Sequence, residues 1–240
     1  SYTYDDVGNI TSVTRNGLTT TYVYDKLGQL IRENDPHANK TTVYNYDRGG
    51  NILSCVEYAY TTGTLGTATL TTAYTYGDSN WKDKVTAIGG KTIYYDIIGI
   101  PRVYEKWVLN WSAGNILDSM ENPDKKVQFA YDHNRMRIKK TVNNVVTNYI
   151  LNGTNIAHLT CGNDELHFFY DAQGKPGMVT YNDVDYFYVY NLQGDVVALI
   201  DANGTQVVEY VYDAWGNPIS KTGSLAATIG TLNPFRYRGY

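Results

Sequence analysis

The aspartates that could do chemistry in this chain stand in a recurring Asp-x-x-Gly pattern. The clearest examples begin at Asp5, Asp25, Asp47 and Asp213. Grouped carboxylates can bind Ca²⁺, but calcium takes about six to eight oxygen ligands, and each of these turns offers only one or two carboxylates. A single aspartate at the start of a turn can instead accept local backbone N–H groups, and glycine adopts the positive φ that closes the turn. The pattern therefore predicts turn capping, with no metal and no cofactor.

The histidines provide no alternative metal motif. His37, His133, His158 and His167 lack the spacing of a zinc site, and His158 and His167 stand nine residues apart without a helical partner. We expect surface or packing roles for them. The sequence also contains no glycine-rich phosphate loop and no nucleophile elbow. We therefore assign no catalytic residue and predict that the chain is not an enzyme.

Tryptophan side chains are the best candidates for contacting a ligand. Trp81, Trp107 and Trp111 could stack against sugar rings, because aromatic faces beside hydroxyl and amide groups suit glycans. The competing interpretation, which we favour, is cross-strand packing, where an aromatic pair contributes about 0.2–1 kcal/mol. The one basic cluster, residues 135–140, divides its charges between the two faces of a strand, so nucleic-acid binding is not predicted.

These residues belong to a repeat that must position them. A tyrosine precedes the aspartate in each clear copy, and Tyr4 and Tyr24 are 20 residues apart, a period typical of repeat architectures. Degenerate copies begin at Tyr76, Tyr131 and Tyr149. The residues that define the seven better copies are Tyr4, Asp5, Gly8, Tyr24, Asp25, Gly28, Tyr46, Asp47, Gly50, Tyr95, Asp96, Gly99, Tyr170, Asp171, Gly174, Tyr190, Gly194, Tyr212, Asp213 and Gly216.

The residues around each turn predict β-strands. Aromatic side chains alternate ahead of the turns, as in Tyr22/Tyr24 and Tyr188/Tyr190, and a period of two indicates a strand. The segments after the glycines are again strand-like. They lead into second turn signals, which are Asn16-Gly17, Gly89-Gly90, Asn143-Asn144 and residues 202–204. We expect an all-β fold of about ten consecutive antiparallel hairpins in a curved, spiralling sheet, with almost no helix and with the longest turns at residues 62–72 and 221–232.

Bulk composition agrees with a partly buried sheet. The chain has 24 tyrosines and five phenylalanines, and only 18% of its residues are charged, with a net charge of −4. Tyrosine packs its ring while its hydroxyl reaches water. The longest apolar run, residues 196–200, is far shorter than the ~20 residues of a spanning helix, so no membrane span is predicted. No composition break marks a boundary, and we expect one repeat array over residues 1–240.

The whole chain resembles the RHS or YD-repeat family, named for the Tyr-Asp dipeptide. Residues 212–219 (YDAWGNPI) and 233–240 (NPFRYRGY) are similar to the beginning of the RHS-associated core segment of that family. The resemblance implies a β-strip wound into a hollow shell that encloses a toxic C-terminal domain, as in bacterial polymorphic toxins; toxin-complex shells and teneurins share the repeat. Family members continue into a self-cleaving core, whereas this chain stops at Tyr240, so the resemblance assigns no catalytic residue here.

The predicted function is therefore structural. We expect a non-catalytic shell segment, secreted or at a cell surface, whose partners are the remainder of the same shell and the polypeptide that it encloses. Open strand edges also predict self-association. The alternative is a cell-surface module that binds glycans through its tyrosine- and tryptophan-rich face.

Overall fold

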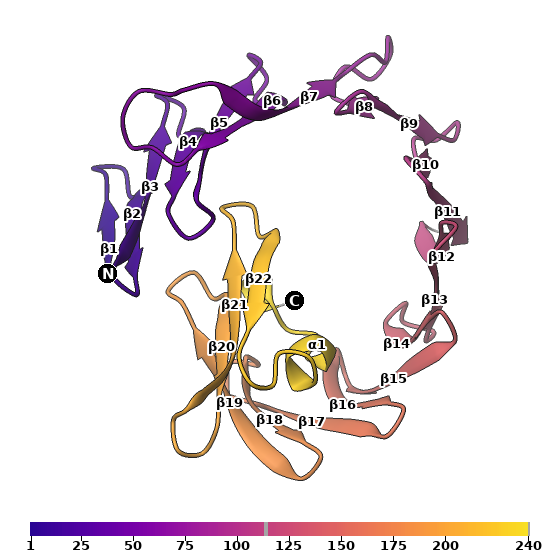
Figure 1. The fold of residues 1–240 in the computed structure, drawn as a ribbon. Coiled ribbons are helices and arrows are strands. Elements are labelled where there is room, and N and C mark those ends of the chain that lie inside the picture. Colours follow the sequence, from indigo (N-terminus) through magenta and orange to yellow (C-terminus); the bar gives the residue numbers. More distant parts are fainter. Residues whose placement is uncertain (113–114, 240) are drawn as a thin grey trace. The chain divides into compact units, whose positions relative to one another are not determined.

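The computed structural model describes residues 1–112 and 115–239, which form two compact units, Ser1–Glu105 and Lys106–Tyr240 (Figure 1). Both units consist of antiparallel strands, most of them joined by short connections, and the connection at residues 76–86 is a longer one. The prediction of an all-β fold is confirmed. Within the described ranges there are 22 strands, while the helical segments are one four-residue α-helix and one three-residue 3₁₀ turn. Neither helical segment has the length or hydrophobicity needed to cross a bilayer.

The first unit is a succession of hairpins in which each strand pairs with the next along the chain. Its strands are β1 (Tyr2–Tyr4), β2 (Ile10–Arg15), β3 (Leu18–Tyr24), β4 (Leu30–Asp35), β5 (Lys40–Tyr46), β6 (Ile52–Ala59), β7 (Ala68–Thr75), β8 (Ala87–Ile88), β9 (Lys91–Tyr95) and β10 (Pro101–Tyr104). Most of its buried side chains are polar, and Tyr44 is its one fully buried hydrophobic residue among those described. The long turn expected at residues 62–72 is shorter than predicted, because residues 68–72 already belong to β7.

The second unit continues the same pattern of sequential antiparallel pairs. Its elements are β11 (Trp107–Ser112), β12 (Ile116–Glu121), β13 (Lys126–Tyr131), β14 (Arg137–Val142), β15 (Val145–Asn152), β16 (Asn155–Cys161), β17 (Asp164–Tyr170), β18 (Pro176–Tyr181), β19 (Val184–Tyr190), β20 (Val196–Ile200), β21 (Gln206–Tyr212), β22 (Pro218–Thr222), α1 (Ile229–Leu232) and η1 (Tyr237–Gly239).

A hydrophobic core lies on one face of β15–β21, and the sheet wraps around α1 there (Figure 1). Its members are Tyr149, Leu159, Leu166, Phe168, Val179, Tyr186, Tyr188, Val196, Leu199, Val207, Val208, Tyr210 and Ile229. We call this surface the tyrosine face. Residues 221–232 are therefore not simply the expected long turn, because they end in α1, whose Ile229 is buried in the core.

The Asp-x-x-Gly turns share one backbone geometry. In the first copy the Gly8 amide donates to the Asp5 carbonyl at 3.1 Å and the Asp5 amide donates to the Asn9 carbonyl at 3.0 Å. A register shift beside the preceding tyrosine marks a β-bulge in most copies, for example between Val23 and Tyr24. The bulge and the turn together make a compact unit that the sequence can repeat.

Two variants of this turn extend the sequence interpretation. Residues 202–204, which we predicted as an Asn-Gly-type second turn, close an Asp-x-x-Gly turn instead, because Gly204 donates to the carbonyl of Asp201 at 3.0 Å. In the copy at Tyr131 the glycine position is taken by Arg135, with φ of 63°. The other predicted second turns are two-residue connections, such as Asn16-Gly17 with φ of 50° and 76°.

Candidate functional site

The repeated tyrosines join neighbouring repeats through their hydroxyl groups. The Tyr24 hydroxyl donates to the carbonyl of Ile10 at 3.0 Å, and Ile10 is the residue that pairs with Tyr4 of the preceding repeat. Equivalent bonds run from Tyr46 to Leu30, Tyr76 to Ile52, Tyr95 to Val85, Tyr131 to Leu117, Tyr170 to Ile156, Tyr190 to Pro176 and Tyr212 to Val196, at 2.6–2.9 Å. We call each such bond a tyrosine clamp. Each clamp fixes one repeat against the one before it.

Burial holds these hydroxyls in their protonated, donating form. Loss of solvent raises the pKa of Tyr170 to about 12, and it raises the pKa of Tyr24, Tyr46 and Tyr95 as well. A neutral phenol can donate to a carbonyl, whereas a phenolate cannot. The clamps are therefore intact over the whole neutral pH range.

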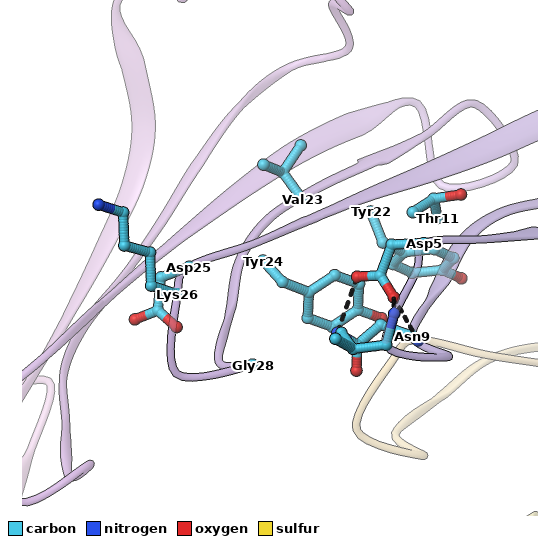
Figure 2. Close-up of a pocket in the computed structure, with 10 residues that line it drawn as sticks. Asp5, Asn9, Thr11, Tyr22, Val23, Tyr24, Asp25, Lys26 and Gly28 are labelled. Carbon is cyan, nitrogen blue, oxygen red and sulfur yellow. Dashed lines mark hydrogen bonds between the residues drawn. The ribbon is translucent and has the colours of Figure 1, made fainter.

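The turn aspartates accept hydrogen bonds from their own turns. Figure 2 shows a surface pocket of about 480 Å³ in the first unit, where Asp5 and Tyr24 lie side by side. Asp5 Oδ1 accepts the amides of Val7 at 3.1 Å and Asn9 at 2.7 Å, and Oδ2 accepts the Asn9 side chain at 2.8 Å. The Asn9 side-chain bond is the main cause that lowers the pKa of Asp5. This carboxylate stabilises the turn and has no acidic proton to give at neutral pH.

The same arrangement recurs in the other copies. Asp47 accepts the amides of Gly49 and Asn51 at 2.8 and 2.9 Å, and the Asn51 side chain lowers its pKa. Asn191 replaces aspartate in the copy at Tyr190, and its Oδ1 still accepts the amides of Gln193 and Asp195. These contacts support the predicted turn-capping role of the repeat residues.

The C-terminal segment, residues 233–239, folds back onto the tyrosine face. Phe235 meets the rings of Phe168, Tyr170 and Tyr188 edge to face, with centroids 5.3, 6.1 and 6.1 Å apart. Asn233 is 1% exposed and accepts the Tyr188 hydroxyl at 2.7 Å. The face therefore already holds one stretch of irregular polypeptide by aromatic packing and buried hydrogen bonds.

Two arginines fix the backbone of this segment. The Arg236 guanidinium lies over the Tyr210 ring at 4.3 Å and donates to the Gly230 carbonyl at 2.8 Å, while its own carbonyl accepts the amide of Val196 at 3.0 Å. Arg238 donates from its backbone to the buried Asp195 carboxylate at 3.0 Å. Main-chain groups of the segment thus bond to Asp195 and Val196 at the start of β20, and the Arg236 side chain adds contacts to Tyr210 and Gly230.

The segment also closes over a repeat glycine. A Cβ added at Gly216 would collide with the ring of Tyr237, which packs against Tyr212 at 5.8 Å. A Cβ at the corresponding Gly174 would meet nothing. Gly216 therefore combines a turn role with a packing role. The segment is the one predicted as the beginning of an RHS-associated core at residues 233–240, of which Tyr240 lies outside the described residues.

The structure places the three candidate tryptophans in different surroundings. Trp81 is 53% exposed in the first unit, where Lys84 lies over its ring at 5.8 Å. Trp107 and Trp111 are half-buried on the same face of β11 in the second unit. Trp81 is the most exposed of these three tryptophans, and its ring also lies against Gly99, where an added Cβ would be 2.7 Å from Cζ3.

Sequence reasoning missed a group formed by His158, His167 and Glu165. The two histidines face each other across β16 and β17, with Nδ1 atoms 3.0 Å apart. The sequence does contain a signal for this pair. Cys161 and Asp164 flank the two-residue turn of the hairpin, and His158 and His167 stand three positions before and three positions after them. Zinc-motif spacing and helical partners do not reveal this pair, because a hairpin pairs residues that are symmetric about its turn.

The repeat, its sequential antiparallel pairing and its clamped turns define a shell-type β-repeat scaffold. The chain belongs to the teneurin YD-shell family, whose profile matches residues 1–230. The expected relationship to YD-repeat proteins is thereby confirmed.

Curated relatives extend the comparison to bacterial proteins. The tRNA3(Ser)-specific nuclease WapA of Bacillus spizizenii is 33% identical over 225 residues, which cover 90% of this chain and 9% of that protein. The tRNA nuclease WapA of Bacillus subtilis has the same identity and coverage. This chain therefore spans about a tenth of the length of these relatives, and their nuclease names describe much longer proteins.

Solved toxin-complex structures share the fold. The Photorhabdus luminescens Tc holotoxin pore aligns with 99% of this chain and 14% of its own matched chain, with a TM-score of 0.68 and 17% identity. The crystal structure of TcdB2–TccC3 aligns over the same shares at a TM-score of 0.67 and 17% identity. At this level of identity the similarity concerns the fold alone.

Proposed function

We propose that this chain is a non-catalytic wall segment of a YD-repeat shell and that its tyrosine face holds polypeptide leading into an enclosed C-terminal domain. The observation that carries the proposal is the docking of residues 233–239, where Phe235 packs among Phe168, Tyr170 and Tyr188. A face of aromatic and aliphatic side chains of this kind offers many separate packing contacts to a polypeptide and needs no catalytic group.

The names of the relatives support a toxin setting for this proposal. The WapA proteins are named as tRNA nucleases, and the segment shared with this chain is 9% of their length. We infer that nuclease activity in such proteins resides outside the segment matched here, and that this chain serves a toxin in a secreted or cell-surface protein. The turn carboxylates support a structural role, because the oxygens of Asp5 and Asp47 accept backbone amides and an asparagine side chain within their own turns.

The test is limited proteolysis of the chain carrying a short, unstructured, lysine-containing reporter fused after residue 240. We expect the lysines nearest the junction to be cut at least about ten-fold more slowly than those of the same reporter fused before Ser1, because protection follows the fraction of time a segment is undocked. Replacement of Phe235 by alanine should remove most of the difference. Equal cleavage rates in the two fusions would contradict the proposal.

The alternative function, glycan binding, is favoured by one observation, the 53% exposure of Trp81. A glycan array with the wild-type chain and with Trp81→Ala, Trp107→Ala and Trp111→Ala separates the two functions. Specific binding that is lost in Trp81→Ala would favour the glycan module. The shell proposal expects no specific glycan signal in any of these proteins.

A further inference from the structure

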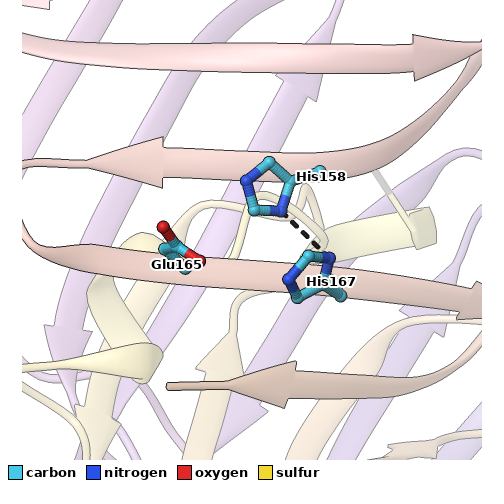
Figure 3. A group of neighbouring side chains, drawn as sticks. All are labelled: His158, Glu165 and His167. Atoms are coloured by element: carbon cyan, nitrogen blue, oxygen red, sulfur yellow. Dashed lines mark hydrogen bonds between the residues drawn. The ribbon is translucent and has the colours of Figure 1, made fainter. Parts of the chain in front are cut away.

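The outer face of β16 and β17 carries a compact group of potential metal ligands. His158 on β16 pairs directly with His167 on β17 (Figure 3). Glu165 precedes His167 by two residues and therefore projects from the same face. The intervening Leu159 and Leu166 are 1% and 0% exposed, so they turn into the core while the histidine pair faces away from it. The core thereby fixes the direction of both histidine side chains.

The two histidine rings share a hydrogen bond, and the separation of their Nδ1 atoms also matches that of two ligands on one metal ion. The two Nδ1 atoms are 3.0 Å apart, and ligand atoms of His158, Glu165 and His167 all lie within 4.8 Å of one another. Zinc binds imidazole nitrogen at about 2.0–2.1 Å, so two such nitrogens lie about 3.3 Å apart on a tetrahedral ion and about 2.9 Å apart on neighbouring corners of a square. The observed separation lies between these values.

The donor set selects the class of ion. Two imidazoles and one carboxylate suit zinc and its neighbours among the divalent transition metals, whereas calcium and magnesium prefer oxygen ligands alone. Three protein ligands leave a fourth position of a tetrahedral zinc ion for water. We propose that His158, His167 and Glu165 form a zinc site that bridges β16 and β17 on the outer face of the second unit.

The proposed site is independent of the shell function. Its ligands face away from the tyrosine face, and β16 and β17 already pair through their backbones. Bound zinc would join the two strands through side chains as well, and it would stabilise the folded chain in proportion to the logarithm of the zinc concentration above the dissociation constant. The site therefore predicts a metal-dependent increase in stability without any change of fold.

The test is isothermal titration of the metal-free, untagged full chain with zinc chloride. We expect one zinc ion per chain and no measurable binding of calcium or magnesium. His167→Ala should weaken zinc binding at least about ten-fold, because only two protein ligands, His158 and Glu165, then remain. His133→Ala is the matched control, because His133 lies in an exposed turn and should leave binding unchanged.

A second measurement guards against misfolding of a variant. Glu165→Gln keeps the size of the side chain and should weaken zinc binding while the melting temperature of the metal-free protein stays that of the wild type. Zinc should raise the melting temperature of the wild-type chain, and EDTA should reverse the rise. The proposal is overturned if the wild-type chain binds no zinc, or if folded His167→Ala binds it as tightly as the wild type.

Discussion

In most repeats one tyrosine hydroxyl donates a hydrogen bond to the preceding repeat. In the copy at Tyr95 the hydroxyl donates to the Val85 carbonyl at 2.6 Å, while the neighbouring Tyr94 points to the opposite face and is 61% exposed. A net hydrogen bond contributes about 0.5–1.5 kcal/mol, and a buried acceptor left without its donor costs more. The clamp is therefore a small stabilising term that recurs along the whole chain.

Removing one clamp should have a measurable effect. Tyr95→Phe keeps the ring, and with it the Lys84 contact at 5.2 Å, but it deletes the hydroxyl. We expect the free energy of unfolding to fall by about 1 kcal/mol, measured by urea denaturation. Tyr94→Phe is the matched control on the same strand and should change stability by less than half as much. Equal effects of the two substitutions would contradict the clamp.

Residue types predicted the turns better than they predicted long-range contacts. The Asp-x-x-Gly pattern correctly indicated turn capping, because the bonds involved span only two to four residues. It overlooked the turn at Asp201, which has Ile200 in place of the tyrosine. The copy at Tyr131 lacks the glycine and still forms the turn, because Arg135 adopts φ of 63° at the glycine position. The backbone hydrogen bonds of this turn outweigh the preference of arginine for negative φ.

At the scale of elements, the alternation of aromatic residues correctly predicted the strands, and sequential turns predicted their order. The docking of residues 233–239 was outside the reach of that reasoning. Phe235 contacts Phe168 and Tyr188, which are far away in sequence, so no local pattern links them. The histidine pair was within reach, since the hairpin turn between β16 and β17 fixes their register.

A glycine pair tests the docking of the C-terminal segment. Gly174 and Gly216 occupy equivalent turns at φ of 79° and 86°, but only at Gly216 would a new Cβ meet Tyr237. Each change to alanine should cost about 1–2 kcal/mol through the positive φ. We expect Gly216→Ala also to speed tryptic cleavage after Arg236 and Arg238, followed by mass spectrometry. Similar cleavage of the two variants would show that Tyr237 does not secure the segment.

At the scale of the whole molecule, the many partly buried tyrosines set the alkaline limit of stability. Burial raises the pKa of Tyr170 to about 12 and moves the pKa of Tyr22, Tyr188, Tyr190 and Tyr212 upward as well. In the unfolded chain these groups ionise near the ordinary tyrosine pKa of about 10. The folded state therefore binds more protons than the unfolded state above about pH 10.

Tyrosine ionisation should therefore leave the free energy of unfolding unchanged below about pH 10 and lower it between about pH 10 and pH 12. Each tyrosine contributes at most about 1.4 kcal/mol per pH unit, and less where water screens the ring. Urea unfolding at a series of alkaline pH values measures the loss, and ultraviolet absorbance of tyrosinate should rise together with unfolding. Tyr170→Phe should show a shallower decline. Full ionisation of the tyrosines before any unfolding would contradict this account.

The predicted self-association can be tested by substitutions at the edge strand β1. Ser1 exchanges hydrogen bonds with Thr14 at 3.0 and 2.9 Å, so in an antiparallel ladder the N–H and C=O of Tyr2 point away from β2. Light scattering should therefore detect concentration-dependent dimers. Tyr2→Pro should reduce them by removing the outward donor, whereas Tyr2→Val removes the same ring and retains the donor. A chain that stays monomeric at high concentration would refute this prediction.

The short reach of the tyrosine clamps has a consequence for how such chains can grow. Tyr24 bonds 14 residues back and Tyr46 bonds 16 residues back, each to the repeat immediately preceding its own. No clamp depends on how many repeats lie further upstream. A complete repeat could therefore be duplicated or deleted by recombination, with the flanking copies forming the same bonds across the new junction. The number of repeats can thus change by whole units without loss of the remaining clamps.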